Sequence, residues 1–223
     1  MKKLVSALLF CLAIDMSGQS ADSTTYSKFD IGFTFSPNYS YRTIKTVASK
    51  SAMKNFYDTL EVARYSYTGG VNILFHVSKN LALGSGFLFS DQGERTKKYL
   101  IQPVNNYVNH YYYIDVPLKA NYYLTHKNVK FFITAGLAAN IYLNSQTNTE
   151  IGNVEKGYMR LSSDMLRLSV SFIGGLGIDC PLTDRWYFRL EPIYRRSLTP
   201  VADAPLKKYF YSAGLNVGLF CKF

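Results

Sequence analysis

The last fifteen residues of the chain alternate strictly between two kinds of side chain. The odd positions from Tyr209 to Phe223 are all apolar, and the even positions between them are mostly small or polar. Successive side chains of a β-strand point to opposite faces, so this period of two predicts one long strand with one apolar face.

The same alternation recurs upstream and divides the chain into eight strands. Short connections at residues 78–80, 125–128 and 182–185 take turns with long ones at 43–63, 96–106, 146–164 and 198–206. Three short turns on one rim and four long loops on the other are typical of an outer-membrane barrel, with both termini on the periplasmic side. We therefore predict an all-β, eight-stranded antiparallel up-and-down transmembrane β-barrel. The strands are expected at residues 29–36, 65–75, 81–95, 107–124, 129–144, 166–179, 186–197 and 209–223.

Period two alone does not say which face is inside, because a soluble lipocalin-like barrel has the same period. Such a barrel would carry its apolar face inward and a Lys- and Glu-rich face outward. Here the polar face is instead rich in Gly, Ser, Asn and Thr, and the apolar face has no charge through the middle of any strand. Small residues suit a narrow lumen, and an uncharged face suits lipid. Aromatic residues cluster near both strand ends, as expected for two membrane interfaces.

Residues 1–18 form the pattern of a secretory signal, with Lys2 and Lys3 before a short apolar run and small residues after it. We place cleavage between residues 18 and 21, a linker at 19–27 and the barrel at 28–223. The removed segment holds two lysines and one aspartate, so the net charge of +10 becomes +9. For an exported protein this charge favours lipid head groups or sugar phosphates as partners, and not nucleic acid. Two cysteines remain, Cys180 and Cys221, and their strands are too far apart for a disulfide.

The fourth predicted strand carries the most specific string, which runs from Tyr112 to Tyr122 as YYIDVPLKANY. It resembles a strand of the PorT-type outer-membrane β-barrel family, and Phe131 to Gly136 look like the strand that follows it there. The last strand, ending in Phe223, is similar to the terminal signal that barrel-assembly machinery recognises. The resemblance covers roughly residues 28–223 and implies an outer-membrane barrel. It also implies an accessory role in protein secretion or assembly. The residues assigned to the assembly signal are Tyr211, Leu219 and Phe223.

Candidate enzymatic chemistry is weak in this sequence. The three histidines, His76, His110 and His126, fall at different expected levels, and none lies beside a convincing nucleophile. The triplet from His76 to Ser78 faintly resembles the His-x-Ser of lipid A deacylases, but it lies at a predicted periplasmic turn. No metal-ligand spacing or phosphate loop occurs. We therefore expect a protein that is not an enzyme and needs no cofactor or metal.

Charged residues fall in two places of the predicted barrel. Those on the inward face of the strands should pair across the narrow lumen, because the fourth and seventh strands lie opposite each other in a ring of eight. The expected lumen network is Asp115, Lys119, Arg167, Asp179, Arg189, Glu191 and Arg195. Cations near the long loops are candidates for contact with lipopolysaccharide phosphates. These are Arg42, Arg64, Lys97, Lys98, Arg196, Lys207 and Lys208.

Three functions are compatible with this sequence. The first is a non-enzymatic outer-membrane barrel with a closed, side-chain-filled lumen and an envelope-integrity or surface-interaction role. The second is an accessory component of a PorT-like secretion or assembly system, and the third is a lipid A-modifying enzyme. The expected partners are outer-membrane lipid and lipopolysaccharide, the barrel-assembly machinery during biogenesis, and a secretion-system or surface partner at the long loops.

Overall fold

The computed structural model describes residues 28–46, 51–96, 106–125, 129–150, 156–159, 165–202 and 207–223. The expected signal segment and linker, residues 1–27, lie outside this part. The described elements are one helix and eleven strands: β1 (Phe29–Lys45), α2 (Ser51–Leu60), β2 (Glu61–Val62), β3 (Arg64–His76), β4 (Leu81–Gln92), β5 (Arg95–Thr96), β6 (Asn106–Tyr123), β7 (Lys130–Glu150), β8 (Lys156–Met159), β9 (Leu168–Pro181), β10 (Trp186–Ser197) and β11 (Lys207–Lys222).

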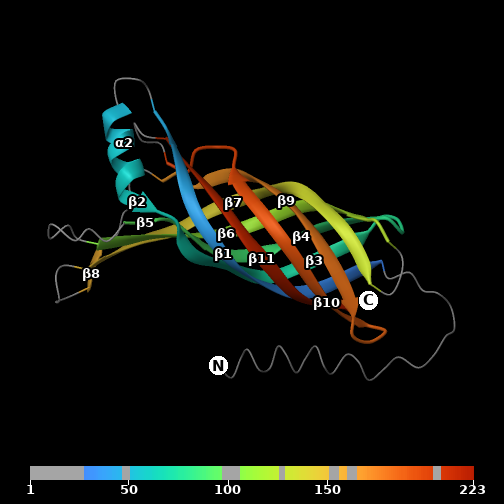
Figure 1. Ribbon diagram of the computed structural model, residues 1–223. Helices are drawn as coiled ribbons and strands as arrows, with labels where there is room; N and C mark the ends of the chain where they lie inside the picture. Colours follow the sequence, from blue (N-terminus) through green and yellow to red (C-terminus); the bar gives the residue numbers. More distant parts are fainter. Residues whose placement is uncertain are drawn as a thin grey trace.

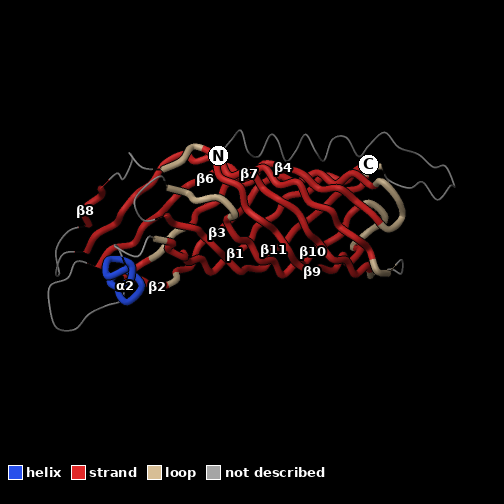
Figure 2. The backbone as a smooth tube through the Cα atoms, turned by 90° about the horizontal axis from the view of Figure 1, so that it is seen from above, coloured by secondary structure: helices blue, strands red, loops and turns tan. Residues whose placement is uncertain are grey.

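Eight long strands close into a barrel, which confirms the predicted fold class. Going round the ring, β6 pairs with β4, β3, β1, β11, β10, β9 and β7 follow in turn, and β7 pairs with β6 again. Every pairing is antiparallel. The short elements α2, β2, β5 and β8 gather at one end, here called the loop end (Figure 1). The C-terminus lies at the opposite end, here called the turn end, where the short connections are found (Figures 1 and 2).

Burial alternates along each strand in the sense that the sequence predicts. In β1 the polar positions Asp30, Ser36 and Asn38 are buried in the lumen, while Phe33 is 60% exposed on the outside. The apolar rows of all eight long strands face outward, which is the reverse of a soluble barrel. Of the described residues, no helical segment has the length and apolar character that a bilayer-crossing helix requires.

The connections at the loop end contain more regular structure than expected. Residues 43–63, predicted as a long loop, include the end of β1, the helix α2 and β2. Strand β7 continues to Glu150, well past the predicted residue 144, and pairs with both β6 and β8 there. Its last residues, Ser145 to Glu150, are all polar. The apolar alternation ends because this extension projects past the apolar outer surface, while the hydrogen-bonded ladder continues.

Three prolines lie within strands and interrupt the pairing on one side only. Pro37, Pro117 and Pro192 each keep a register partner on one neighbouring strand, and the ladder is interrupted only on the other side. The strand continues through each proline, because a missing N–H removes a bond on one side only. The described β6–β7 ladder has its register shift elsewhere, between Tyr112 and Tyr113.

The register separates the two cysteines of the barrel. Phe188 of β10 pairs with Cys180 on one side, and Trp186 of β10 pairs with Cys221 on the other. Two strand spacings are roughly 10 Å, and a disulfide needs Cα atoms within about 7 Å. The structure accordingly has no disulfide between Cys180 and Cys221.

Candidate functional site

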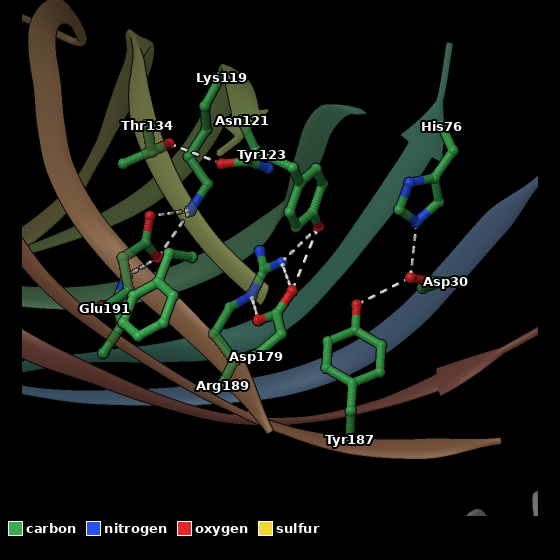
Figure 3. A network of polar contacts seen from close by, with 12 residues as sticks. Asp30, His76, Lys119, Asn121, Tyr123, Thr134, Asp179, Tyr187, Arg189 and Glu191 are labelled. Atoms are coloured by element: carbon green, nitrogen blue, oxygen red, sulfur yellow. Dashed lines mark hydrogen bonds and ion pairs between the residues drawn. The ribbon is translucent and has the colours of Figure 1, made fainter. Parts of the chain in front are cut away.

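The turn-end half of the lumen holds a buried arginine that bonds to side chains of two other strands. Arg189 of β10 donates to both carboxylate oxygens of Asp179 on β9, from Nε and from Nη2, at 2.7 Å each. Its Nη2 also donates to the Tyr123 hydroxyl of β6 at 3.0 Å (Figure 3). The guanidinium carbon lies 4.3 Å from the ring centroid of Phe132 and 4.9 Å from that of Phe220. Arg189 is thus paired with a carboxylate and in contact with two aromatic rings, so the cost of burying its charge is offset.

A second ion pair crosses the lumen beside the first. Lys119 of β6 donates to both oxygens of Glu191 on β10, at 3.2 and 3.1 Å. Asn216 of β11 donates to the same carboxylate at 2.8 Å. Both charged side chains are buried, so water does not screen the pair. The contact joins two strands that are not neighbours in the ring.

A third ion pair lies closer to the loop end. Arg195 of β10 donates from Nη1 to Asp115 of β6 at 3.1 Å, and Asn140 of β7 donates to the other oxygen of Asp115 at 2.7 Å. Asp115 is fully buried. Strands β6 and β10 are therefore linked by side chains at three levels: through Tyr123 and Arg189, through Lys119 and Glu191, and through Asp115 and Arg195.

At the turn end a histidine and a tyrosine share one carboxylate. His76 of β3 lies with Nε2 at 2.8 Å from Oδ2 of Asp30 on β1, and the Tyr187 hydroxyl of β10 donates to the same oxygen at 2.8 Å (Figure 3). Ser78 accepts hydrogen bonds from the backbone of Asn80 and Leu81 in the turn that follows. This geometry assigns Ser78 to the turn and His76 to the lumen lining.

An apolar cluster lies in the lumen at the loop end. Val201 and Ala202, expected in a long surface loop, are 2% and 6% exposed. Val201 packs with Tyr111, Tyr113 and Phe210, and its backbone bonds to Leu166 and Lys208 hold it in place. A segment between β10 and β11 thus turns into the mouth of the barrel, where its apolar residues are sheltered from water.

Six of the seven predicted lumen residues lie in the lumen and contact one another in pairs. The partners differ from those expected for Arg189, which bonds to Asp179 of the adjacent strand. The expectation for Arg167 was wrong: this residue is exposed and lies in a bend before β9 begins. The strand starts two residues later than the alternation indicates, so Arg167 does not follow its inward row. Sequence reasoning also missed Asp30, Tyr123 and Tyr187, although their inward positions could be read from the same alternation.

The cations predicted at the loop-end rim fall into two groups. Three of them, which we expected on the surface, are turned inward by carboxylates: Arg42 pairs with Glu61, Arg64 with Asp91, and Lys208 with Glu94. Arg42 and Arg64 are buried, so the expectation that they contact lipopolysaccharide was wrong. Arg196 and Lys207 are exposed on the outer face, and Lys97 and Lys98 lie outside the described residues.

Burial changes the pKa of Glu61, the acid of the Arg42–Glu61 ion pair at the rim. Desolvation, followed by the nearby Glu94 carboxylate, raises the pKa of the Glu61 carboxyl against the opposing effect of Arg42. The Tyr107 hydroxyl donates to Glu61 at 2.6 Å, and Tyr41 donates to its backbone carbonyl at 2.9 Å. Glu61 therefore ties α2 and β2 to the barrel wall.

The candidate catalytic histidines are placed apart. His110 faces outward at the loop end, with Nδ1 at 3.0 Å from Asp91, while His76 lies in the turn-end lumen. His126 lies outside the described residues. Within the described part of the chain, no three His, Cys, Asp or Glu side chains are grouped so that they could hold a metal ion.

The predicted assembly-signal residues share the outer face of the last strand. Leu219 is exposed, and Tyr211 packs edge-on against Tyr41 with ring centroids 5.9 Å apart. The Phe223 ring stacks on Phe29 at 5.5 Å, and its amide donates to the Phe29 carbonyl at 3.0 Å.

Deleting Phe223 is expected to reduce the amount of protein that reaches its membrane. The stability of the folded barrel should change little. The reason is that Phe223 is half exposed, with 51% of its surface accessible, so little of its apolar area is buried on folding. Cell fractionation and quantitative blotting measure the effect. The matched control is Phe29→Ala, which removes the stacking partner and keeps the terminal residue. Normal levels after the deletion, or an equal defect in the control, would contradict a sorting role.

Comparison with known proteins relates this chain to a protein family and to several solved structures. A family model described as an outer membrane protein beta-barrel domain matches residues 17–203. Among solved structures, the outer membrane protein OprG from Pseudomonas aeruginosa is similar over 88% of this chain and 96% of its own, with 13% identity and a TM-score of 0.50. Neisserial surface protein A is similar over 88% and 98%, with 13% identity and a TM-score of 0.47. No curated protein matches the chain.

Proposed function

Because this chain belongs to the outer membrane protein beta-barrel domain family, and so resides in the outer membrane of a Gram-negative cell, we propose that it is a non-enzymatic envelope protein whose lumen is closed by its own side chains. A closed lumen supports an integrity or surface-interaction role, because the surfaces left for contact are the outer wall and the loops. The shared likeness to OprG concerns the fold alone.

One observation carries this proposal: the side-chain bonds between β6 and β10 that cross the lumen. Strands β7 and β9 separate these two strands on the shorter way round the ring. The Lys119–Glu191 and Arg195–Asp115 ion pairs nevertheless join them directly. A ring of eight strands has an interior about wide enough for side chains to fill, and these side chains meet within it. Solute passage would require the buried pairs to separate, which leaves charges unpaired at low dielectric.

We expect the unmodified protein to show no steady conductance in planar-bilayer recordings. Replacing both partners of one crossing pair, in Lys119→Ala/Glu191→Ala, should permit small flickering currents, because a crossing contact is lost and no lone charge is left behind. The control is Lys28→Ala/Lys79→Ala, which changes two exposed lysines outside the lumen. Insertion is checked in each case by the gel mobility of unboiled samples. A large, stable pore in the unmodified protein would overturn the closed lumen.

A finer assignment, to the PorT-type barrels, rests on the string from Tyr112 to Tyr122. The inward residues of that string include Asp115 and Lys119, which form two of the crossing ion pairs. This supports a role for the string in building a barrel of this type. An accessory part in protein secretion remains a proposal drawn from the resemblance, and co-purification of a secretion component with the intact protein would test it.

A further inference from the structure

Three outward-facing cations at the loop end differ from Arg42, Arg64, Arg195 and Lys208, each of which pairs with a carboxylate. Lys45, Lys207 and Arg196 are exposed, and no ion pair within the described residues involves them. Their chain neighbours Ile44, Lys208 and Arg195 point the other way, into the lumen. We call Lys45, Lys207 and Arg196 the outer cation patch.

The patch stands on adjacent strands. Lys45 of β1 and Lys207 of β11 are direct register partners, and Arg196 of β10 is the partner of Tyr211 on β11. Like charges placed directly opposite each other on neighbouring strands are destabilising unless an anion lies between them. Among the described outward positions of β9, β10, β11 and β1 there is no Asp or Glu to supply that anion. An anion supplied from outside these strands would compensate this charge.

Tyrosines fix the height of the patch relative to the membrane. The Lys45 ammonium lies 4.9 Å from the ring centroid of Tyr209, and Tyr41 and Tyr211 form an edge-on pair below it. Further down, the outer faces of the same strands are apolar from Ala213 to Leu219. Tyrosines with apolar surface below and cations above mark the level where acyl chains give way to head groups. Because the long loops of such barrels are extracellular, this is the outer leaflet.

We propose that the outer cation patch binds the phosphate groups of a phosphorylated glycolipid of the outer leaflet, of the lipid A class. The cations occupy two levels, since Lys45 and Lys207 lie four residues beyond the Tyr41–Tyr211 pair at which Arg196 stands. Four strand residues span about 13 Å. Two levels suit a head group that carries two phosphates. Arg196 offers a bidentate donor at the lower level, and the lysine pair offers two point charges at the upper one.

Native mass spectrometry of the full chain in detergent tests this proposal with three probes: bis-phosphorylated lipid A, its dephosphorylated form and phosphatidylglycerol. We expect the unmodified protein to prefer bis-phosphorylated lipid A over both others. The variant Lys45→Gln/Lys207→Gln should bind it about twenty-five-fold more weakly, from roughly five-fold for each cation near a membrane surface. The matched control Lys28→Gln/Lys79→Gln removes the same charge at the turn end and should leave affinity unchanged.

Each alternative outcome decides against the proposal. Equal binding of dephosphorylated lipid A by the unmodified protein would show that the phosphates are not recognised, and this arm needs no variant. Equal competition by phosphatidylglycerol would indicate a generic anionic surface. Full affinity in the Lys45→Gln/Lys207→Gln variant, with its folded gel mobility retained, would place the lipid elsewhere. The proposal is independent of the closed lumen, because none of its residues faces inward.

Discussion

Replacing Arg189 by alanine is expected to lower the free energy of unfolding by about 3–5 kcal/mol, the cost of leaving a buried partner charge uncompensated. Asp179 is 5% exposed and receives both bonds from this guanidinium, so the substitution leaves a buried carboxylate without its cation. The contacts of Arg189 with Phe132 and Phe220 are lost as well. Urea titration of the protein in lipid vesicles, followed by circular dichroism, measures the change.

Two further variants separate the charge of Arg189 from its shape. Arg189→Lys keeps the charge but loses the bidentate geometry, and should fall between the unmodified protein and Arg189→Ala. Arg189→Ala/Asp179→Asn removes both charges and should recover part of the loss. A change below about 1 kcal/mol in Arg189→Ala, as for an exposed ion pair, would mean that water reaches this site and that the lumen is more open than proposed.

A methyl group added at Gly136 should destabilise the barrel by about 1–3 kcal/mol, as overpacking does in a dense interior. Gly136 of β7 is the register partner of Lys119, and a Cβ atom there would overlap the Leu118 carbonyl oxygen and the Lys119 Cα. Both are backbone atoms of β6, so they cannot swing aside. The substitution Gly136→Ala would therefore have to displace the strand that carries Lys119.

Gly174→Ala is the matched control for this substitution. A Cβ at Gly174 would meet only the Phe172 ring, at 3.0 and 3.1 Å, and this ring is on the outer face, where it can turn. We expect little loss or a slight gain in stability, because alanine restricts the unfolded chain. The same urea titration compares the two. If Gly136→Ala lowers the stability as little as Gly174→Ala does, the lumen wall tolerates added volume, and the argument that small residues are needed there is weakened.

Arg189 and Gly136 together show how a narrow barrel accommodates long charged side chains. Glycines on the inward rows bring neighbouring backbones close and leave volume for Arg189, Lys119 and Glu191 near the axis. The outer wall follows the opposite rule, because its exposed residues are large and apolar. The proposed closed lumen and the proposed lipid contact thus lie on opposite faces of the same strands.

The local alternation of side chains was sufficient to predict the eight long strands, their order round the barrel and the face that most of their residues occupy. This is because period two is a property of the extended backbone itself and does not depend on distant contacts. The six charged residues that it assigns to the inward face are buried in the structure: Asp115, Lys119, Asp179, Arg189, Glu191 and Arg195. The same alternation of odd and even positions predicts that Lys207 faces outward and Lys208 faces inward. The prediction of the rim cations did not use it.

Only the tertiary structure decided which charges meet. Three pairings depend on the stagger between strands and on the closure of β6 against β7. They are Lys119 with Glu191, Arg189 with Asp179, and Arg42 with Glu61. The inward turn of Val201 and the folding of residues 51–62 into α2 and β2 likewise carry no period-two signal. A one-residue change of stagger would leave each strand's own pattern intact and change its partners, so no single strand's sequence encodes these contacts.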